Sequence, residues 1–212
     1  MIKIYLDGCS EEAIKIAEKF DLGLTTNPTI MHKDYPEKGI LWILERLTQT
    51  SISEIFIQMD SFEEKIVEKL NPKKFVIKIP WLREKYDLAL EFKRRGFRIC
   101  ATSVYYPSQI LTALMIGTDY IAFYFDRSLK KGLDPKKSIL TFKNILEKSN
   151  SSSILLVASL KSVDQVFETL RCGITHLSLP LEVFYELLKD NEFTVEDAKH
   201  FFEDFSVLIN ME

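Results

Sequence analysis

Short apolar runs alternate with amphipathic stretches along the whole chain. We expect strands at eight of these runs, which span residues 2–6, 22–25, 54–59, 75–79, 97–101, 120–124, 154–158 and 175–179. Several runs are almost continuously hydrophobic, as is typical of parallel strands that are buried on both faces. A stretch that can form a helix follows each run, and successive runs lie mostly about 20 to 35 residues apart, the length of a strand–helix–strand unit.

Eight such units favour a closed (β/α)8 barrel of the TIM type over an open sheet. The 212 residues are enough for one domain of this kind, spanning 1–212, and too few for two ordinary domains. Between the strands, we expect residues 62–70 to be helical, while 130–137 is the most loop-like stretch.

Residues 194–208 follow the eighth unit and predict an additional C-terminal helix. Its apolar residues recur at spacings of three and four, which places most of them on one helical face. Exposure of such a stripe to water is unfavourable and promotes association. We therefore expect a homo-oligomer held partly by this helix. The alternative is that the helix folds back across the outside of its own barrel.

The composition is ordinary for a globular protein, with 46% hydrophobic and 28% charged residues. The net charge of −3 gives no general attraction to nucleic acid or to an anionic membrane, so neither is expected as a partner. Any recognition of phosphate must come from a few well-placed cations.

The cysteines and the apolar runs bear on the environment of the protein. Cys9, Cys100 and Cys172 are an odd set in apolar or helix-start surroundings, so we interpret them as core thiols. No run reaches the roughly 18 apolar residues of a membrane span, and the first residues do not resemble a signal peptide. A cytoplasmic location is the default expectation.

Polar residues stand at the carboxyl ends of seven of the eight predicted strands. In chain order they are Asp7, Thr25 and Asn27, Gln58, Lys78, Thr102, Tyr124 and Ser159. In a barrel these ends meet at one face, where active sites lie. One or two such residues would mean little, but seven strands that end in this way predict a functional site.

Lys78 is the residue with the most distinctive chemistry, because it lies between Ile77 and Ile79 inside an apolar strand. Burial among aliphatic side chains removes hydration and penalises the charged ammonium. A neutral amine can attack a ketone carbonyl and form an iminium, which makes the adjacent C–C bond easier to break. The alternative is an edge lysine whose ammonium reaches solvent.

Eight short motifs resemble those of a known family in both order and spacing. They are YLDG, LTTNPT, IQM, VIKIP, SVYYPSQ, FDR, ASLK and LPLEV. Together they are similar to the small transaldolase-like family, which includes fructose-6-phosphate aldolase and short transaldolases. The resemblance covers nearly the whole chain. It implies that Lys78 forms the Schiff base, that no metal or cofactor is needed, and that the protein forms a pentamer or decamer.

The resemblance also implies roles for residues around the lysine. Asp7 resembles the carboxylate that moves protons on substrate hydroxyls. Thr25 and Asn27 look like polar contacts to the bound substrate, and Thr102 resembles a threonine that holds a catalytic water.

A phosphate-binding set is implied at Arg127, Ser159 and Lys161. A guanidinium, a hydroxyl and an ammonium from neighbouring loops can clamp a dianion, although each alone is also consistent with a solvated loop. Trp81 stands where the family usually carries a small residue, which predicts a large ring at the rim of the pocket.

Two positions separate the subgroups of the family. Transaldolases resemble one another in having Glu at the end of the third strand and Phe at the end of the sixth. This chain has Gln58 and Tyr124, as fructose-6-phosphate aldolase does. A phenol that acts as an acid or base favours release of a free ketone.

The sequence therefore predicts a class I aldolase that acts on fructose 6-phosphate or a related ketose phosphate. The first alternative is a transaldolase that moves a dihydroxyacetone unit between sugar phosphates. The second is a barrel that binds sugar phosphates without catalysis, because a barrel fold by itself does not determine function.

Overall fold

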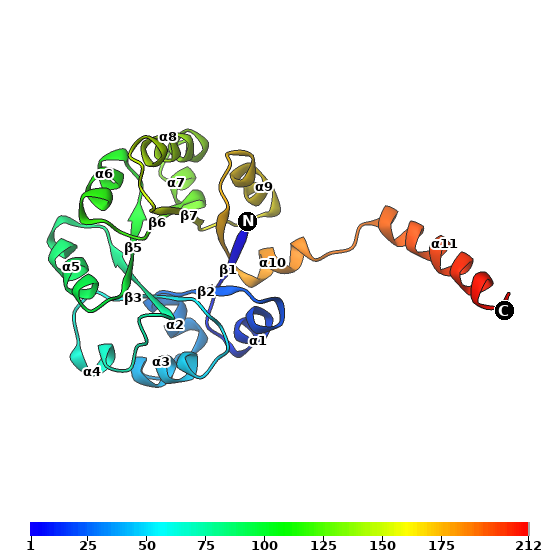
Figure 1. Ribbon diagram of the computed structural model, residues 1–212, viewed down its shortest axis with the longest axis horizontal. Helices are drawn as coiled ribbons and strands as arrows, with labels where there is room; N and C mark the ends of the chain where they lie inside the picture. Colours follow the sequence, from blue (N-terminus) through cyan, green and yellow to red (C-terminus); the bar gives the residue numbers. More distant parts are fainter. Residues whose placement is uncertain (212) are drawn as a thin grey trace.

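The computed structural model describes residues 1–211 (Figure 1). Its strands are β1 (Lys3–Asp7), β2 (Gly23–Thr25), β3 (Ile55–Gln58), β4 (Phe75–Pro80), β5 (Arg98–Val104), β6 (Tyr120–Tyr124), β7 (Ile154–Ala158) and β8 (His176–Leu179). They form one closed barrel in chain order, in which neighbours are parallel and β8 pairs with β1. The predicted (β/α)8 barrel is confirmed.

The helices surround the barrel on the outside, except for the last one, which stands apart from it (Figure 1). They are α1 (Glu11–Phe20), α2 (Pro28–Asp34), α3 (Ile40–Thr48), α4 (Glu64–Val67), α5 (Tyr86–Arg94), α6 (Pro107–Ile116), α7 (Phe125–Lys130), α8 (Pro135–Lys148), α9 (Val163–Arg171), α10 (Leu181–Leu187) and α11 (Glu192–Ile209). A short 3-10 helix, η1 (Arg83–Lys85), links β4 to α5. Helix α2 was not predicted; it begins at Pro28, with Asn27 as its cap.

Two predicted segments between the strands differ from the structure. The helix expected over 62–70 is reduced to α4, because no side chain caps its first turn and the backbone N–H groups of Lys69 and Leu70 bond three residues back, in tighter turns. The stretch expected as a loop over 130–137 is irregular only at 131–134, since α7 ends at Lys130 and α8 begins at Pro135.

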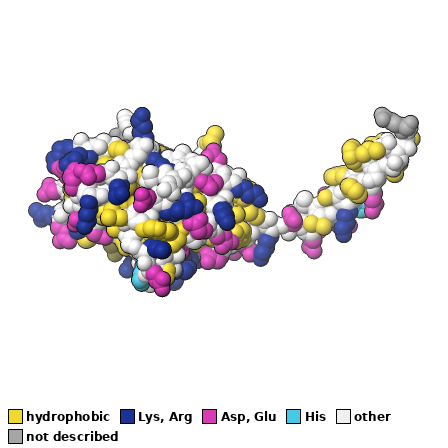
Figure 2. Space-filling model, turned by 90° about the horizontal axis from the view of Figure 1, so that it is seen from below, with side chains coloured by type: hydrophobic (Ala, Val, Ile, Leu, Met, Phe, Trp, Pro, Cys, Tyr) yellow, Lys and Arg dark blue, Asp and Glu magenta, His cyan; other side chains and the backbone are white. Residues whose placement is uncertain are grey.

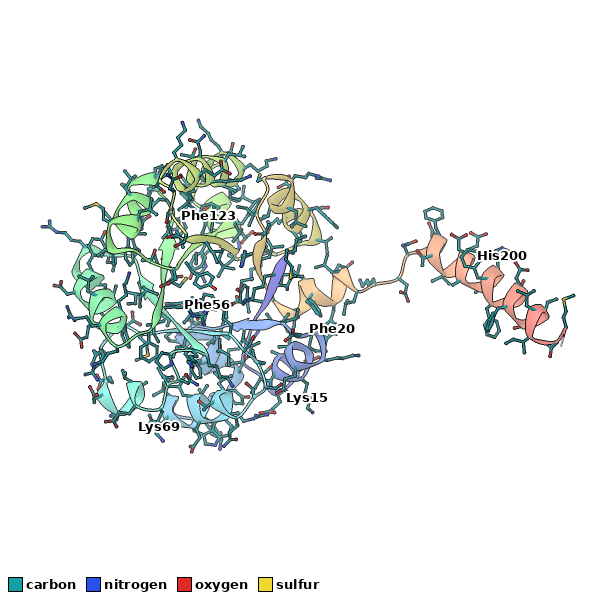
Figure 3. All side chains as sticks on the ribbon, in the orientation of Figure 1. Lys15, Phe20, Phe56, Lys69, Phe123 and His200 are labelled. Carbon is teal, nitrogen blue, oxygen red and sulfur yellow. The ribbon has the colours of Figure 1, made fainter. Side chains whose placement is uncertain are left out.

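Alternation along each strand divides the core into two parts. Every second side chain points into the barrel, and the remainder pack between the strands and the helices. The inner cluster consists of Tyr5, Phe56, Val76, Cys100, Tyr120, Ala122 and Leu156. Figure 3 shows Phe56 within the ring of strands. Phe123 has the opposite orientation and packs edge-on against Phe142 of α8, with the ring centroids 5.4 Å apart.

A buried carboxylate closes the end of the barrel where the strands begin. Glu54 is only 3% exposed. The hydroxyls of Tyr5 and Tyr120 each donate to its carboxylate at 2.7 Å. Lys3 and Arg98 form ion pairs with the same carboxylate. Four donors from β1, β5 and β6 therefore satisfy one charge that would otherwise be costly to bury.

Gly23 provides the space that this arrangement needs. A Cβ atom at Gly23 would lie 2.3 Å from Cδ1 of Tyr5, the residue that faces it in the β1–β2 ladder. Glycine is therefore required for Tyr5 to direct its ring into the barrel and its hydroxyl to Glu54.

The C-terminal helix α11 stands apart from the barrel (Figures 1 and 2). None of its residues is buried. It begins two residues earlier than predicted, because the side chain of Asn191 accepts a hydrogen bond from the backbone of Thr194 at 2.9 Å. The alternative that this helix folds back across its own barrel is therefore wrong.

Two further predictions concern the cysteines and membrane spans. All three cysteines are free and buried, as predicted for core thiols. Within residues 1–211, no helix has the length and apolar character required to cross a bilayer. The cytoplasmic location stays a prediction.

The hydrogen bonds to Glu54 predict acid sensitivity of the fold. Burial alone would raise the pKa of Glu54, but hydrogen bonds from Lys3, Tyr5 and Tyr120 outweigh it and lower the pKa to about 2. The unfolded-state pKa of a glutamate is about 4.3. The ionised carboxylate therefore contributes its full stability above about pH 4.3. This contribution is lost as the pH falls towards 2.

We expect Glu54→Gln to lower the free energy of unfolding at pH 7 by about 1.5–3 kcal/mol, the typical contribution of a hydrogen bond to a charged group. Part of the loss of stability in acid should disappear in this variant. Urea unfolding at pH 7, 4 and 3 measures both effects, with the exposed Glu45→Gln on α3 as the matched control. The same pH dependence in both variants would contradict the prediction.

Candidate functional site

A cavity of about 120 Å³ opens where the strands end. It is lined by Asp7, Asn27, Lys78, Tyr124, Asp126, Arg127, Lys130, Ala158, Ser159 and Lys161. These residues lie on or directly after β1, β2, β4, β6 and β7. Seven of the ten residues predicted for the site line this cavity: all except Thr25, Gln58 and Thr102.

Lys78 faces the interior because it lies two residues after Val76, which belongs to the inner core cluster. It pairs with Gln58 on one side and Cys100 on the other, so β4 is a central strand here. The residue is 3% exposed, and its Nζ donates to the backbone carbonyl of Thr26 at 3.0 Å. The alternative of an edge lysine that reaches solvent is therefore wrong.

Asp7 lines the cavity, whereas Thr25 supports it from behind. The Thr25 hydroxyl donates to Oδ1 of Asp7 at 3.0 Å and lies 2.6 Å from the hydroxyl of Ser178 on β8. Thr25 is 1% exposed and does not reach the cavity. The structure thus gives Thr25 a contact to Asp7 in place of the predicted contact to substrate. The sequence analysis did not include Ser178, although it lies at an inward-facing position of β8.

Asn27 has two roles in this structure. Its side-chain oxygen accepts a hydrogen bond from the backbone of Ile30 at 3.1 Å and so caps α2. The same residue lines the cavity. Because the cap uses only the carbonyl oxygen, the amide NH₂ of Asn27 stays available to a ligand.

Tyr124 and Thr102 form a hydroxyl pair beside the lysine. Their oxygens are 2.7 Å apart, and Thr102 is completely buried behind Tyr124. The guanidinium of Arg127 lies over the Tyr124 ring, 4.6 Å from its centroid. Tyr105 packs edge-on against the same ring at 6.1 Å. These contacts hold the phenol in place. The role of Thr102 in holding a catalytic water stays a prediction.

Gln58 ends β3 next to Lys78 in the ladder, but it does not line the cavity. Its side-chain nitrogen donates to Oδ2 of Asp60 at 3.2 Å. A function for Gln58 at the reacting atoms would therefore require the side chain to leave Asp60.

Three further predicted residues also line the cavity. Arg127 belongs to α7, while Ser159 and Lys161 lie in the loop after β7. Ser159 adopts a left-handed backbone with φ of 59°, which is uncommon for serine and often marks functional loops. The side-chain oxygen of Gln165 accepts a hydrogen bond from the backbone of Lys161 at 2.7 Å and so holds the loop.

The end of β5 and the loop after it are built in a similar way. Ser103, the last residue but one of β5, also has a φ of 59°. In the loop that follows, the side-chain oxygen of Gln109 accepts a hydrogen bond from the backbone of Tyr105 at 2.8 Å. In each case, the glutamine follows the left-handed serine by six residues. Two strand ends around the cavity are thus held by one recurring arrangement, which the sequence alone did not reveal.

Trp81 is not at the rim of the pocket, so that prediction is wrong. The side chain is 3% exposed and is absent from the cavity wall. Its ring nitrogen donates to Thr112 of α6 at 2.9 Å, and its ring packs against Tyr86 at 4.9 Å. Because Lys78 points inwards, alternation directs Trp81, three residues later, towards the outer helices.

Asp126 and Lys130 also line the cavity, although we did not predict them as site residues. Their spacing on α7 places both side chains on the same face of the helix, next to Arg127. The cavity wall therefore carries four basic and two acidic side chains. Within residues 1–211, no group of three or more His, Cys, Asp or Glu is arranged as a metal site would require.

A comparison with known protein families completes the description of this site. The family model described as Transaldolase/Fructose-6-phosphate aldolase matches residues 4–212. The chain belongs to this family. As a member of the transaldolase/fructose-6-phosphate aldolase family, the protein is an enzyme of the aldolase type, in agreement with the resemblance seen in the sequence motifs.

Proposed function

We propose that this family member is a class I aldolase that forms a Schiff base at Lys78. It would cleave or form fructose 6-phosphate, or a related ketose phosphate, with dihydroxyacetone and an aldose phosphate as the partners. The observation that carries the proposal is the shared cavity: the buried Lys78 lines it together with the carboxylate of Asp7 and the phenol of Tyr124.

The first half of the proposed reaction is cleavage. The Lys78 amine attacks the ketone carbonyl at C2, and loss of water from the carbinolamine leaves an iminium. Asp7 accepts the proton of the C4 hydroxyl, and the electrons of the C3–C4 bond pass to the iminium nitrogen. The aldose phosphate leaves and an enamine remains on Lys78.

The second half is release. A proton added at C3 converts the enamine back to an iminium, and water then attacks C2. Collapse of the carbinolamine frees dihydroxyacetone and restores the amine. We assign the proton transfer to Tyr124, acting directly or through water, because its hydroxyl is held by Thr102 at 2.7 Å beside the same cavity.

Phosphate recognition is assigned to Arg127, Ser159 and Lys161. Their side chains line the cavity from α7 and from the loop after β7, and charge-assisted contacts of this kind suit a phosphate dianion. In this arrangement the phosphate end of the sugar would bind near α7 and its ketone end near Lys78.

The alternative within the family is a transaldolase, in which the enamine is kept for a second aldehyde. The aldolase is preferred because the chain has the phenol of Tyr124 in the same cavity as Lys78, whereas the transaldolases resemble one another in having Phe at this position. A barrel that only binds sugar phosphates is the remaining alternative, and it would form no covalent adduct.

We also propose that α11 joins copies of the chain into a cyclic homo-oligomer, either a pentamer or a decamer. Phe201, Phe202 and Phe205 are each at least 60% exposed on this helix. Apolar side chains gather along it where it projects from the barrel (Figure 2). Burial of such a stripe is favourable by about 25 cal/mol for each Å² of apolar surface.

Borohydride reduction in the presence of dihydroxyacetone should trap a secondary amine at Lys78, which peptide mass spectrometry would locate. Lys78→Arg should abolish both trapping and turnover, because a guanidinium stays protonated. Lys65→Arg, at an exposed position of α4, is the matched control and should behave like the unmodified chain. No adduct on any lysine would favour the barrel that only binds.

Release of free dihydroxyacetone from fructose 6-phosphate without an acceptor aldehyde should be observed if the protein is an aldolase. An enzymatic assay for dihydroxyacetone, with and without erythrose 4-phosphate, measures release against transfer. Transfer that is much faster than release would make the protein a transaldolase. The Tyr124→Phe variant should move the balance towards transfer, because it removes the proposed proton donor.

Truncation after Asn191 should reduce the size of the assembly, because it removes the exposed apolar stripe of α11. Light scattering of the full chain and of the truncated chain gives the masses. A monomeric full chain would rule out the proposed oligomer, and an unchanged mass after truncation would place the interface elsewhere.

A further inference from the structure

One ion pair inside the cavity has no role in the reaction proposed above. Asp126 and Lys130 both line the cavity, and their charged atoms are 2.7 Å apart across one turn of α7. The Asp126 side chain is 14% exposed, whereas that of Lys130 is 73% exposed. The carboxylate is therefore the fixed partner, and the ammonium is the one that is free to move.

Several contacts join Asp126 of α7 to the loop after β7, which carries Ser159 and Lys161. Its backbone N–H donates to the carbonyl of Ser159 at 3.0 Å. Its Oδ1 accepts a hydrogen bond from Gln165 at 3.5 Å, and Gln165 also holds the backbone of Lys161. The hydrogen bond from Lys130 lowers the pKa of Asp126, and the contact to Gln165 and the charge of Lys161 act in the same direction. The site thus contains an ionised carboxylate.

A fixed negative charge at this place opposes the binding of a phosphate dianion, because like charges in a partly buried site repel. It does not oppose the binding of a neutral sugar. Lys130 cancels this charge as long as the pair is intact. The cations Arg127 and Lys161 can then act on a phosphate without competition from Asp126.

We propose that Asp126 and Lys130 together set the preference of this site for phosphorylated over unphosphorylated ligands, with Lys130 shielding the carboxylate. The inference rests on the proposed function insofar as a phosphate is the natural ligand. Lys130 and Asp126 are specificity-determining residues in this view, and neither takes part in bond making.

The test is a double-mutant cycle on phosphate binding. Inorganic phosphate is titrated by calorimetry into the full-length chain at low ionic strength, where screening is weak. Lys130→Met should weaken binding about fivefold, the upper end of what a solvent-exposed ion pair contributes. Asp126→Asn should tighten binding, and Lys130→Met should have little effect in the Asp126→Asn background.

The matched control is Lys143→Met on α8. Lys143 forms the same kind of pair with Glu147, at 3.8 Å, outside the cavity, so the variant changes the net charge equally. It should leave phosphate binding unchanged. An equal loss in the control, no phosphate binding by the unmodified chain, or an undiminished effect of Lys130→Met in the Asp126→Asn background would each overturn the proposal.

Trapping of dihydroxyacetone at Lys78 separates this inference from the proposed function, because that ligand carries no phosphate. Trapping is measured on the unmodified full-length chain. If the adduct forms at Lys78 but the variants do not change the affinity for phosphate, the inference is wrong and the proposed aldolase function stands. If no adduct forms but the affinities change as expected, the proposed aldolase function is wrong and the ion pair still controls the binding of an anion.

Discussion

The alternation of side chains along parallel strands is the constraint on which this structure depends. In a closed barrel every second residue must fit inside a narrow ring, while its neighbours pack against the helices. Val76 faces inwards, so Lys78 does too, and the lysine is surrounded by protein at the point where β4 leaves the ring. A shift of one residue in β4 would place Ile77 inside and Lys78 among the outer helices.

The same alternation gives the barrel two different ends. At the start of the strands, Glu54 is enclosed by Tyr5, Tyr120, Lys3 and Arg98, which satisfy its charge. At the other end, the inward positions carry acids, bases and hydroxyls around an open cavity. Stability is concentrated at the closed end, and the polar groups for binding and chemistry are kept at the open one, as is general for this type of barrel.

The cavity depends on supporting residues as much as on those that line it. Thr25 and Thr102 are buried and do not line the cavity, yet their hydroxyls form hydrogen bonds with Asp7 and Tyr124, respectively. A glutamine likewise holds each of the loops after β5 and β7. Side chains fixed in this way lose little entropy when a substrate binds, which is what an aldolase would need in order to place a ketone against one amine.

The sequence by itself determined the barrel, the strands at nearly their observed positions, and Lys78 as a buried residue at the end of a strand, because nearly continuous apolar runs and short motifs are local properties. It also placed Asp7, Tyr124, Arg127 and Ser159 at strand ends. Only the tertiary structure decided that Trp81 lies outside the pocket and that α11 projects from the barrel. The pairing of Asp126 with Lys130 inside the cavity likewise came from the structure. These features depend on which side of the ring a segment reaches and on what packs against it, and no local pattern contains that information.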